Sequence, residues 1–330
     1  HDWAGLTSRR DAFVKRLNGI YARNLERKGI EHLRGYGRLL APDRVAVAGR
    51  ELVARHVIIA TGGRPVRPDL PGAEVALVGT GYVAVEFAGV FRALGSEVTV
   101  VCRHASVLRS FDELLQRSLV EAMEADGVRF AFHTAPAGLA REGGGTVLLA
   151  ADGRRLGPFD AVIWAVGRAP VTADLGLAAA GVATDAAGFI PTDLYQATNV
   201  PNVYAVGDVT GREALTPVAI AAGRRLCDRV FGGKAGRHLD YRNIPTVVFS
   251  HPTIGTCGLS EADARAEFGA AVKVYTTEFV PLYYGVMTSK PKTRMKLVVV
   301  GDEERVVGCH IFGPGADEML QGFAVAIRMG

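Results

Sequence analysis

A glycine turn between a buried strand and a helix constrains the fold of this chain more than any other feature of its sequence. The apolar run 75–78 is predicted to be the strand, the turn follows as Gly79-x-Gly81-x-x-Ala84, and a helical stretch covers 82–94 before the next strand. This order is that of a βαβ unit. In such a unit the first glycine makes a tight turn, the second lets a pyrophosphate approach the backbone, and the small third residue lets helix and strand pack. The N–H groups at the start of the helix then face the diphosphate, so the turn predicts a dinucleotide site.

The residues after the second strand of this unit indicate which dinucleotide binds. A site for NADH needs an acidic residue at the end of that strand to accept hydrogen bonds from the ribose. Here the strand 98–101 is followed by Arg103, His104 and Arg109, while Glu97 lies at its other end. Two guanidinium groups in one loop suit a dianionic phosphate, because each donates a forked pair of charge-assisted hydrogen bonds. The pattern therefore favours NADPH, and the alternative is a solvated basic loop.

The remaining periodicity predicts an α/β chain whose character changes near residue 241. Before that point we expect strands at 44–47, 52–53, 56–60, 161–166 and 203–206, helices at 12–28, 112–125 and 217–230, and a β-meander within 129–159. After it we expect an antiparallel sheet, with strands at 246–250, 272–276, 295–300 and 305–311 and flanking helices at 260–268 and 316–329.

Composition limits the classes of partner. With 330 residues, 48% of them hydrophobic, the chain is long enough for two or three domains with cores of their own. The net charge of +4 comes from scattered basic residues, which argues against nucleic acid as a partner. The apolar runs are too short to cross a membrane, so no membrane association is expected.

The four cysteines, Cys102, Cys227, Cys257 and Cys309, lie far apart in the sequence. They form neither a CxxC pair nor the spacing of a zinc site, so no metal is expected. Each is expected to serve as a small, semi-buried apolar residue. Their scarcity fits a reducing cytoplasm, which is the expected location. The chain starts with His1 rather than Met, and no signal peptide opens it.

Several motifs, in a fixed order along nearly the whole chain, resemble the glutathione reductase family. They are Ala60-Thr61-Gly62-Gly63-Arg64-Pro65, the turn at Gly79, Arg103-x5-Arg109-Ser110-Phe111-Asp112, Ala165-Val166-Gly167-Arg168, Tyr204-Ala205-Val206-Gly207-Asp208, Leu215-Thr216-Pro217-Val218-Ala219 and Thr246-Val247-Val248-Phe249-Ser250-His251-Pro252. The resemblance implies an α/β fold with two Rossmann-like FAD/NAD(P)-binding domains and a C-terminal α+β dimerisation domain. The implied boundaries are 1–74 and 171–240 for the two parts of the FAD domain, 75–170 for the NADPH domain and 241–330 for the dimerisation domain.

The resemblance also implies which residues bind each cofactor. For FAD they are Gly37, Thr61, Gly62, Asp208 and Thr216. For NADPH they are Gly79, Thr80, Gly81, Tyr82, Val83, Glu86, Arg103, His104, Arg109, Gly167, Ala214 and Val247. Tyr82 resembles the aromatic residue that covers the nicotinamide pocket, although from sequence alone it is a packing residue at a helix start. Glu86 is similar to a carboxylate that pairs with a lysine near the flavin, and that lysine would lie upstream of His1. The alternative for Asp208, without the resemblance, is that it caps a helix or a turn.

The positions matching Ile20, Tyr21, Asn24 and Arg224 line the disulfide-substrate cleft in the family. An arginine such as Arg224 can bind a glycine carboxylate of glutathione disulfide through two parallel hydrogen bonds. Trypanothione reductases carry smaller or apolar residues at the positions matching Asn24 and Arg224, so the residues here suit glutathione. The alternative is that Arg224 is an ordinary exposed helix residue.

The implied activity passes electrons from NADPH to FAD, then to a redox dithiol, and then to glutathione disulfide. The implied assembly is a homodimer formed through 241–330, with Leu282 and Tyr283 at positions that match interface residues in relatives. The rivals are another flavin disulfide reductase (a thioredoxin reductase or a dihydrolipoamide dehydrogenase) and a non-catalytic NADPH-binding remnant. Arg103 and Arg109 disfavour the dehydrogenase, since they suit NADPH.

Three departures from the family pattern matter. The opening FAD fingerprint and the CxxxxC pair are expected before residue 1, and the chain stops at Gly330, before the expected His-Pro-Thr-x-x-Glu segment. The connector between Pro65 and Val75 is shorter than usual for the family. A thiolate relay needs both cysteines and that histidine, so the catalytic set is incomplete here, with Glu86 supporting and Tyr82 gating. We expect a truncated version of an active enzyme.

Overall fold

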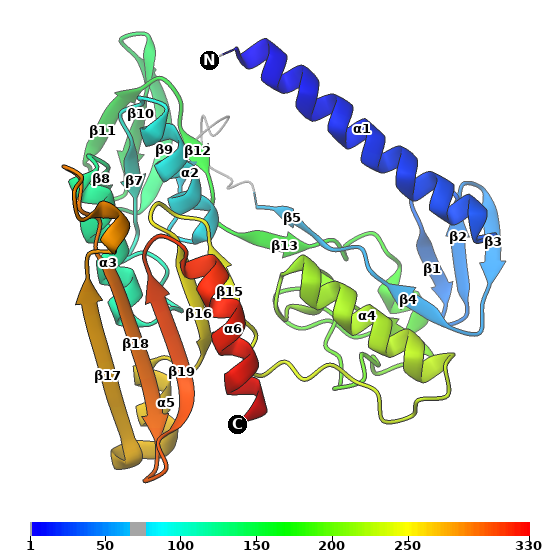
Figure 1. Ribbon diagram of the computed structural model, residues 1–330. Helices are drawn as coiled ribbons and strands as arrows, with labels where there is room; N and C mark the ends of the chain where they lie inside the picture. The colour runs from blue at the N-terminus through cyan, green and yellow to red at the C-terminus, as the bar shows by residue number, and fades with distance from the viewer. Residues whose placement is uncertain (1, 67–76) are drawn as a thin grey trace. The chain divides into compact units, whose positions relative to one another are not determined.

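The computed structural model describes residues 2–66 and 77–330, which divide into two compact units (Figure 1). The first unit contains 2–62 and 170–239, and the second contains 63–66, 77–169 and 240–330. The segments expected to bind FAD belong mainly to the first unit, and those expected to bind NADPH and to dimerise belong mainly to the second. The division into an FAD domain in two parts, an NADPH domain and a dimerisation domain stays a prediction. The short connector before Val75, and the first half of the strand predicted at 75–78, lie outside the described residues.

The first unit combines two small sheets with helices. Its elements are α1 (Trp3–Arg27), β1 (Arg38–Ala41), β2 (Arg44–Val47), β3 (Arg50–Val53), β4 (Val57–Ile59), the 3-10 helix η1 (Leu177–Ala180), β14 (Val203–Ala205), the 3-10 helix η2 (Gly207–Thr210) and α4 (Thr216–Val230). Strands β1, β2 and β3 form an antiparallel sheet, and β4 pairs with β14 in parallel. Fully buried Ile190, Val203, Ala205 and Val209 lie at the centre of the core.

Helix α1 begins at Trp3, earlier than the predicted residue 12. The apolar spacing that predicts the helix starts only at Phe13, but Asp2 caps the earlier start by accepting a hydrogen bond from the N–H of Gly5 (2.8 Å). The end of the helix at Arg27 lies one residue before the predicted end at residue 28. Gly29 has φ +64°, and the N–H of Ile30 donates to the carbonyl of Leu25 (2.9 Å), the hydrogen bond of a Schellman motif.

The second unit begins with a parallel sheet and an antiparallel sheet. Its elements up to residue 170 are β5 (Gly63–Pro65), β6 (Leu77–Val78), α2 (Tyr82–Ala93), β7 (Thr99–Val101), α3 (Glu113–Ala125), β8 (Arg129–Ala131), β9 (Pro136–Glu142), β10 (Gly145–Ala150), β11 (Arg155–Phe159), β12 (Ile163–Trp164) and β13 (Arg168–Pro170), whose last residue belongs to the first unit. The parallel sheet has the order β12-β6-β7-β8, and β9, β10 and β11 are antiparallel. Strand β5 pairs with β13. Val85 and Ala88 of α2 and Leu115 and Leu119 of α3 are fully buried in one core cluster, so both helices pack against the same core.

The predicted β-meander is confirmed only in part. Strands β9, β10 and β11 are antiparallel neighbours, but β8 pairs in parallel with β7. Helix α3 connects β7 to β8 and gives the chain the length that a parallel crossover needs. The strand at 129–131 is therefore the fourth of the dinucleotide-type sheet.

The C-terminal part of the second unit is the expected antiparallel sheet with flanking helices. Its elements are β15 (Thr246–Val248), β16 (Ile254–Gly258), α5 (Glu261–Phe268), the 3-10 helix η3 (Gly269–Ala271), β17 (Val272–Phe279), the 3-10 helix η4 (Leu282–Tyr284), β18 (Thr293–Val300), β19 (Arg305–Phe312) and α6 (Ala316–Met329). The sheet order is β15-β16-β19-β18-β17.

Strand β16 was not predicted, because its two glycines weaken the strand pattern. One of them is required by packing. A Cβ atom at Gly255 would lie 2.6 Å from the carbonyl oxygen of Ala316, so the glycine lets α6 approach the sheet.

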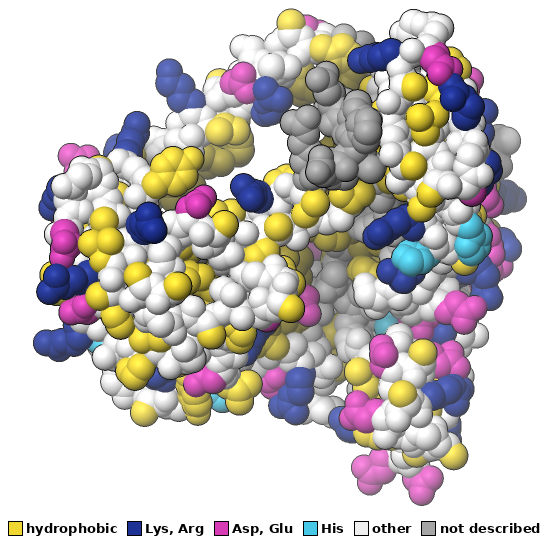
Figure 2. Space-filling model, turned by 180° about the vertical axis from the view of Figure 1, so that it is seen from behind, with side chains coloured by type: hydrophobic (Ala, Val, Ile, Leu, Met, Phe, Trp, Pro, Cys, Tyr) yellow, Lys and Arg dark blue, Asp and Glu magenta, His cyan; other side chains and the backbone are white. Residues whose placement is uncertain are grey.

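Charges of both signs are mixed on the molecular surface. Figure 2 shows Lys and Arg side chains interspersed with Asp and Glu over the described part of one face. Exposed pairs such as Arg44–Glu51 (3.0 Å) contribute little to stability, because solvent screens them. No helix within residues 2–66 and 77–330 is both long and apolar enough to cross a bilayer.

Candidate functional site

The glycine turn after β6 has the geometry of a phosphate-binding turn. Gly79 has φ +151°, and a Cβ atom there would lie 2.2 Å from the carbonyl oxygen of Ala165, so only glycine fits against the end of β12. Gly81 is different, because a Cβ atom there would meet no described atom within 4 Å. Ala84, the third position, is 1% exposed and packs in the core. The turn therefore closes tightly on one side and leaves open space on the other.

The open space adjoins the N-terminus of α2. Gly81 is the N-cap residue, and no described side chain caps the helix. Uncapped N–H groups and the helix dipole attract an anion at this position. The residues present thus fit the diphosphate of a dinucleotide, with Thr80 in the turn, Tyr82 exposed at the first helical position and Val83 next to it.

The basic loop after β7 is tied to the glycine turn. The N–H of Leu108 donates to the carbonyl of Thr80 (2.8 Å), and the N–H of Phe111 donates to the carbonyl of Leu108 (2.8 Å). Leu108 is 3% exposed, so it anchors one end of a tight turn whose next residue is Arg109. This backbone link holds the arginine beside the glycine turn.

Arg103 and Arg109 are both exposed, and within residues 2–66 and 77–330 neither side chain forms an ion pair or hydrogen bond. Partial burial and the positive charges of Arg109 and Arg103 lower the pKa of His104 below its ordinary value of 6.5. His133 contributes to the same effect. The loop thus gathers positive charge for which the described part of the chain provides no counter-ion, and such a region suits a phosphate.

His133 is a basic neighbour that the sequence analysis missed. Strand β8 lies beside β7, so the residues after the two strands meet at the same edge of the parallel sheet. The N–H of His133 lies 3.4 Å from the carbonyl oxygen of His104. The misassignment of β8 to a meander hid this proximity.

Glu86 connects the dinucleotide half of the second unit to its C-terminal half. Its carboxylate accepts a hydrogen bond from the backbone N–H of Phe249 (2.9 Å), directly after β15, the strand that contains Val247. One turn along α2, a Cβ atom at Gly89 would lie 2.8 Å from Nδ1 of His251, so helix and segment approach closely. Gly167 follows β12 with φ +116° and has open space where a Cβ would lie, as far as the structure describes the chain. Ala214 is the only predicted NADPH residue in the first unit.

The expected flavin residues gather at the ends of two parallel strands of the first unit. Thr61 and Gly62 follow β4, and Asp208 follows β14, so they lie at the same carboxyl edge. The hydroxyl of Thr61 donates to the carbonyl of Val171 (2.8 Å). Thr216 begins α4, which packs against η2, since a Cβ atom at Gly207 would contact Ala219 at 3.3 Å. Gly37, directly before β1, lies apart in sequence and is exposed. A carboxyl edge with acceptor and hydroxyl groups fits the polar part of a flavin nucleotide.

The expected substrate residues lie on two helices. Ile20, Tyr21 and Asn24 are on α1, where Tyr21 is 66% exposed, and Arg224 is on α4. Arg224 lines a depression of about 640 Å³. The depression's lining also includes Ile220, Gly223, Arg225, Cys227, Asp228 and Arg237. A surface with this many guanidinium groups can bind a carboxylate ligand.

The cysteines do not form a redox pair among the described residues, where all four are free. Burial raises the pKa of Cys102 to about 12 and that of Cys309 to about 11, so both remain thiols at neutral pH. Cys257 is also buried, and burial raises its pKa. The expectation of semi-buried cysteines was wrong for Cys227, which is exposed on α4.

Comparison with known proteins places this arrangement in a family. Residues 73–223 match the pyridine nucleotide-disulphide oxidoreductase family model, and residues 244–330 match the dimerisation domain of the same family. The whole chain aligns with 77% of a glutathione reductase from Yarrowia lipolytica at 40% identity. It also aligns with 77% of a glutathione reductase from Schizosaccharomyces pombe at 41% identity.

Among solved structures, the fold is similar to that of the Cu(II) complex of RclA, an HOCl-induced flavoprotein disulfide reductase from Escherichia coli. The TM-score is 0.88 at 24% identity, with 99% of this chain and 79% of that chain covered. The likeness supports the α/β fold expected from the sequence.

The fold and the glycine turn thus define a dinucleotide-binding oxidoreductase. The chain belongs to the pyridine nucleotide-disulphide oxidoreductase family, and glutathione reductases are among its relatives. The family uses FAD and NADPH. Both alignments, over 367 and 360 positions, are longer than the 330 residues of this chain, so each relative has internal segments that this chain lacks.

Proposed function

We propose that this chain serves a glutathione-disulfide reductase, in which NADPH reduces FAD and the electrons pass through a redox dithiol to glutathione disulfide. The observation that carries the proposal is a pair of guanidinium groups beside the glycine turn, on Arg103 and Arg109, that have no partner among the described residues. The identity of 40% with a glutathione reductase supports the assignment of the substrate. The same residues favour NADPH over NADH, and hence a reductase over a dihydrolipoamide dehydrogenase.

The second unit would hold NADPH. The α2 N-terminus and Gly81 receive the diphosphate, while Arg103, His104 and Arg109 bind the 2′-phosphate. Tyr82 is 45% exposed, so its ring is free to cover the nicotinamide pocket and to move aside for the cofactor. The Glu86 carboxylate is held by the N–H of Phe249, which fixes the helix that presents Tyr82.

The first unit would hold FAD and part of the substrate. Asp208 accepts hydrogen bonds from ribitol hydroxyls, with Thr61, Gly62, Thr216 and Gly37 as further contacts. Bound FAD accepts a hydride from NADPH and passes electrons to a disulfide. Arg224, with Ile20, Tyr21 and Asn24, binds glutathione disulfide by pairing with a glycine carboxylate.

The dithiol step is not assigned to any of the four cysteines of this chain, because three of them are buried thiols and none has a partner at redox spacing. In the proposed enzyme the acid/base histidine would come from a His-Pro-Thr-x-x-Glu segment of a partner subunit. A complete enzyme of this kind would maintain reduced glutathione in the cytoplasm.

A homodimer would form through 241–330. The supporting observations are the match to a dimerisation domain and the exposure of apolar side chains around η4. Leu282 is 95% exposed, Tyr283 71% and Val286 98%. Contiguous exposed apolar residues of this size are typical of a protein interface.

The assignment of NADPH is tested by replacing Arg103 and Arg109 together with alanine. Loss of charge-assisted hydrogen bonds, each worth about 1.5–3 kcal/mol, should raise the Kd for NADPH by roughly 100-fold and leave the Kd for NADH almost unchanged. Isothermal titration calorimetry measures both, and Arg117→Ala, an exposed arginine on α3, is the matched control. Equal losses for the two cofactors would contradict the proposed site. A protein that binds NADPH without ever showing flavin absorbance would favour the non-catalytic remnant.

A further inference from the structure

Asp112 is a buried carboxylate at the end of the basic loop, and its position is fixed by four groups. It is 2% exposed. Its Oδ1 accepts from the N–H of Leu114 (2.9 Å) and thereby caps α3, and it also pairs with Nζ of Lys296 (2.8 Å). Its Oδ2 accepts from the N–H of Glu261 (3.0 Å) and lies 3.9 Å from Nε2 of His310. A carboxylate with this many partners cannot shift without breaking several contacts.

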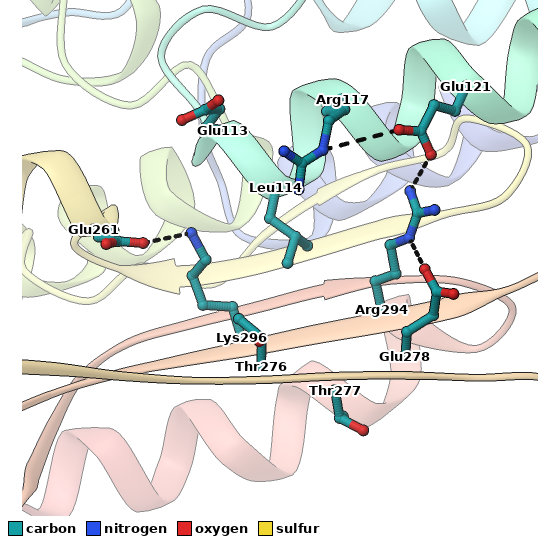
Figure 3. Close-up of a pocket in the computed structure, with 10 residues that line it drawn as sticks. All are labelled: Glu113, Leu114, Arg117, Glu121, Glu261, Thr276, Thr277, Glu278, Arg294 and Lys296. Carbon is teal, nitrogen blue, oxygen red and sulfur yellow. Dashed lines mark hydrogen bonds and ion pairs between the residues drawn. The ribbon is translucent and has the colours of Figure 1, made fainter.

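Lys296 is the cation of this cluster and projects from β18. The ammonium pairs with Asp112 and with the Glu261 carboxylate at the start of α5 (2.9 Å), the contact drawn in Figure 3. Burial lowers the pKa of Lys296, but the two carboxylates outweigh it and raise the pKa overall, so the ammonium stays charged. A single side chain therefore joins the end of the basic loop to the C-terminal sheet.

The backbone places this cluster next to Arg109. The turn that begins at Leu108 carries Arg109 and Ser110 and ends at Phe111, and Asp112 follows directly. Leu108 fixes the near end of the turn to Thr80, in the glycine turn. Lys296 fixes the far end through Asp112. Arg109 thus lies between two anchors, one at the diphosphate turn and one in the C-terminal sheet.

We propose that Lys296, acting through Asp112, is a positioning residue that sets the preference for a 2′-phosphorylated dinucleotide. It holds the far end of the turn so that the Arg109 guanidinium meets the 2′-phosphate. The inference rests on the proposed function of the basic loop and extends it to a residue in the other half of the unit. Arg109 is exposed and has no side-chain partner among the described residues, so the backbone of the turn determines which positions its guanidinium can reach, and a bound phosphate would orient it there.

The rival explanation is that Lys296 only holds α3 to the sheet. Arg294 provides a matched control, because it lies two residues away on the same face of β18 and also pairs with α3 (Figure 3). Its ion-pair partners are Glu121 (2.5 Å) in the middle of α3 and Glu278 (2.6 Å) on β17. Its guanidinium also donates to the hydroxyl of Ser118 on α3 (3.1 Å), and none of these contacts involves Asp112. Loss of Arg294 weakens the same interface without releasing the loop.

The experiment compares Lys296→Met with Arg294→Met by calorimetric titration with NADPH, NADH and 2′,5′-ADP. We expect Lys296→Met to raise the Kd for NADPH and 2′,5′-ADP by about tenfold, the equivalent of one charged hydrogen bond, while the Kd for NADH changes by less than about twofold. Arg294→Met should lower the melting temperature and leave all three affinities within about twofold of wild type.

Lys296→Met leaves a buried carboxylate without its cation, which is strongly destabilising. The double variant Asp112→Asn/Lys296→Met removes both charges and keeps an acceptor for the N–H of Leu114, so it serves if the single variant does not fold. It should show the same selective loss. A folded variant of either kind that keeps the wild-type preference for NADPH overturns the positioning role. A wild-type protein without that preference overturns the proposed NADPH site instead, and with it the premise of the inference.

Discussion

Two glycines of the same turn should respond in opposite ways to the same substitution. At Gly79 a Cβ atom would lie 2.2 Å from the carbonyl oxygen of Ala165, and φ is +151°. At Gly81 a Cβ atom meets no described atom within 4 Å, and φ is −81° with ψ 178°. Gly79→Ala therefore damages the protein itself, whereas Gly81→Ala fills space that only a ligand would need.

The magnitudes follow from these contacts. A Cβ at Gly79 must push against the backbone of Ala165, directly after β12, which cannot rotate away as a side chain can, so Gly79→Ala should lower the free energy of unfolding by about 3 kcal/mol. Gly81→Ala keeps an allowed backbone conformation, so its free energy of unfolding should change by less than about 0.5 kcal/mol. Its methyl group would stand where a pyrophosphate approaches, and the Kd for NADPH should rise about tenfold or more.

Thermal unfolding and calorimetric titration with NADPH separate the two effects. Gly95→Ala, another positive-φ glycine after α2 with no described neighbour to clash with, controls for backbone strain alone. If Gly81→Ala binds NADPH as tightly as wild type, the diphosphate does not sit on this turn. If Gly79→Ala is as stable as wild type, the close approach of the turn to Ala165 is not a feature of the fold.

Two further predictions concern pH. Partial burial and the charges of Arg109 and Arg103 lower the pKa of His104 below 6.5, so a bound 2′-phosphate should raise that pKa and bring a proton with it. Calorimetry in buffers of different ionisation enthalpy should show proton uptake when NADPH binds near pH 6.5. The uptake should be absent when NADH binds and in the variant His104→Gln. Equal uptake in the variant would contradict the role of His104. Burial also lowers the pKa of His310 below 6.5 in the folded protein. As the pH falls below 6.5, His310 is therefore protonated in the unfolded chain before it is protonated in the folded one, and stability should fall. The pKa of Lys296 is raised above 10.5, so its contribution is complete below that pH and is lost as the pH rises through the folded-state pKa. Melting temperatures measured across the pH range check both the acid and the alkaline loss of stability. His310→Gln should reduce the fall in melting temperature at acid pH. An unchanged fall would assign this loss of stability to other groups.

The local pattern of the sequence predicts most of the fold. Short apolar runs give β4, β7 and β14, two of them leading into glycine turns, and helical spacing gives α2, α3 and α4 close to their observed bounds. The errors have particular causes. Helix α1 starts earlier than its apolar stripe because a cap, not burial, fixes its start, and no residue of α1 is buried. Strand β16 was not predicted because Gly255, which the close packing of α6 requires, interrupts the apolar pattern typical of a strand.

The candidate site is predictable to the extent that it is local. Gly79, Gly81 and Ala84 lie within one turn, and Arg103 and Arg109 lie within one loop, so spacing alone suggests their roles. His133 depends on which strand lies beside β7, a property of sheet order that strand patterns do not contain. One incorrect strand partner was enough to hide a charge that acts directly on His104.

Buried ion pairs are not predicted by local sequence patterns, because their partners come from distant parts of the chain. In the sequence, Asp112 is only the last residue of a motif, and Lys296 is only a polar residue within a predicted β-strand. What joins them is the register of β18, in which Lys296 pairs with His310 of β19 and so lies in the cluster that surrounds Asp112. A shift of one residue would turn Lys296 to the other face of the sheet and leave Asp112 buried without a cation. The cost of an unpaired buried charge therefore helps to fix the register. The same contact that would orient Arg109 toward a phosphate also selects the correct alignment of the C-terminal sheet.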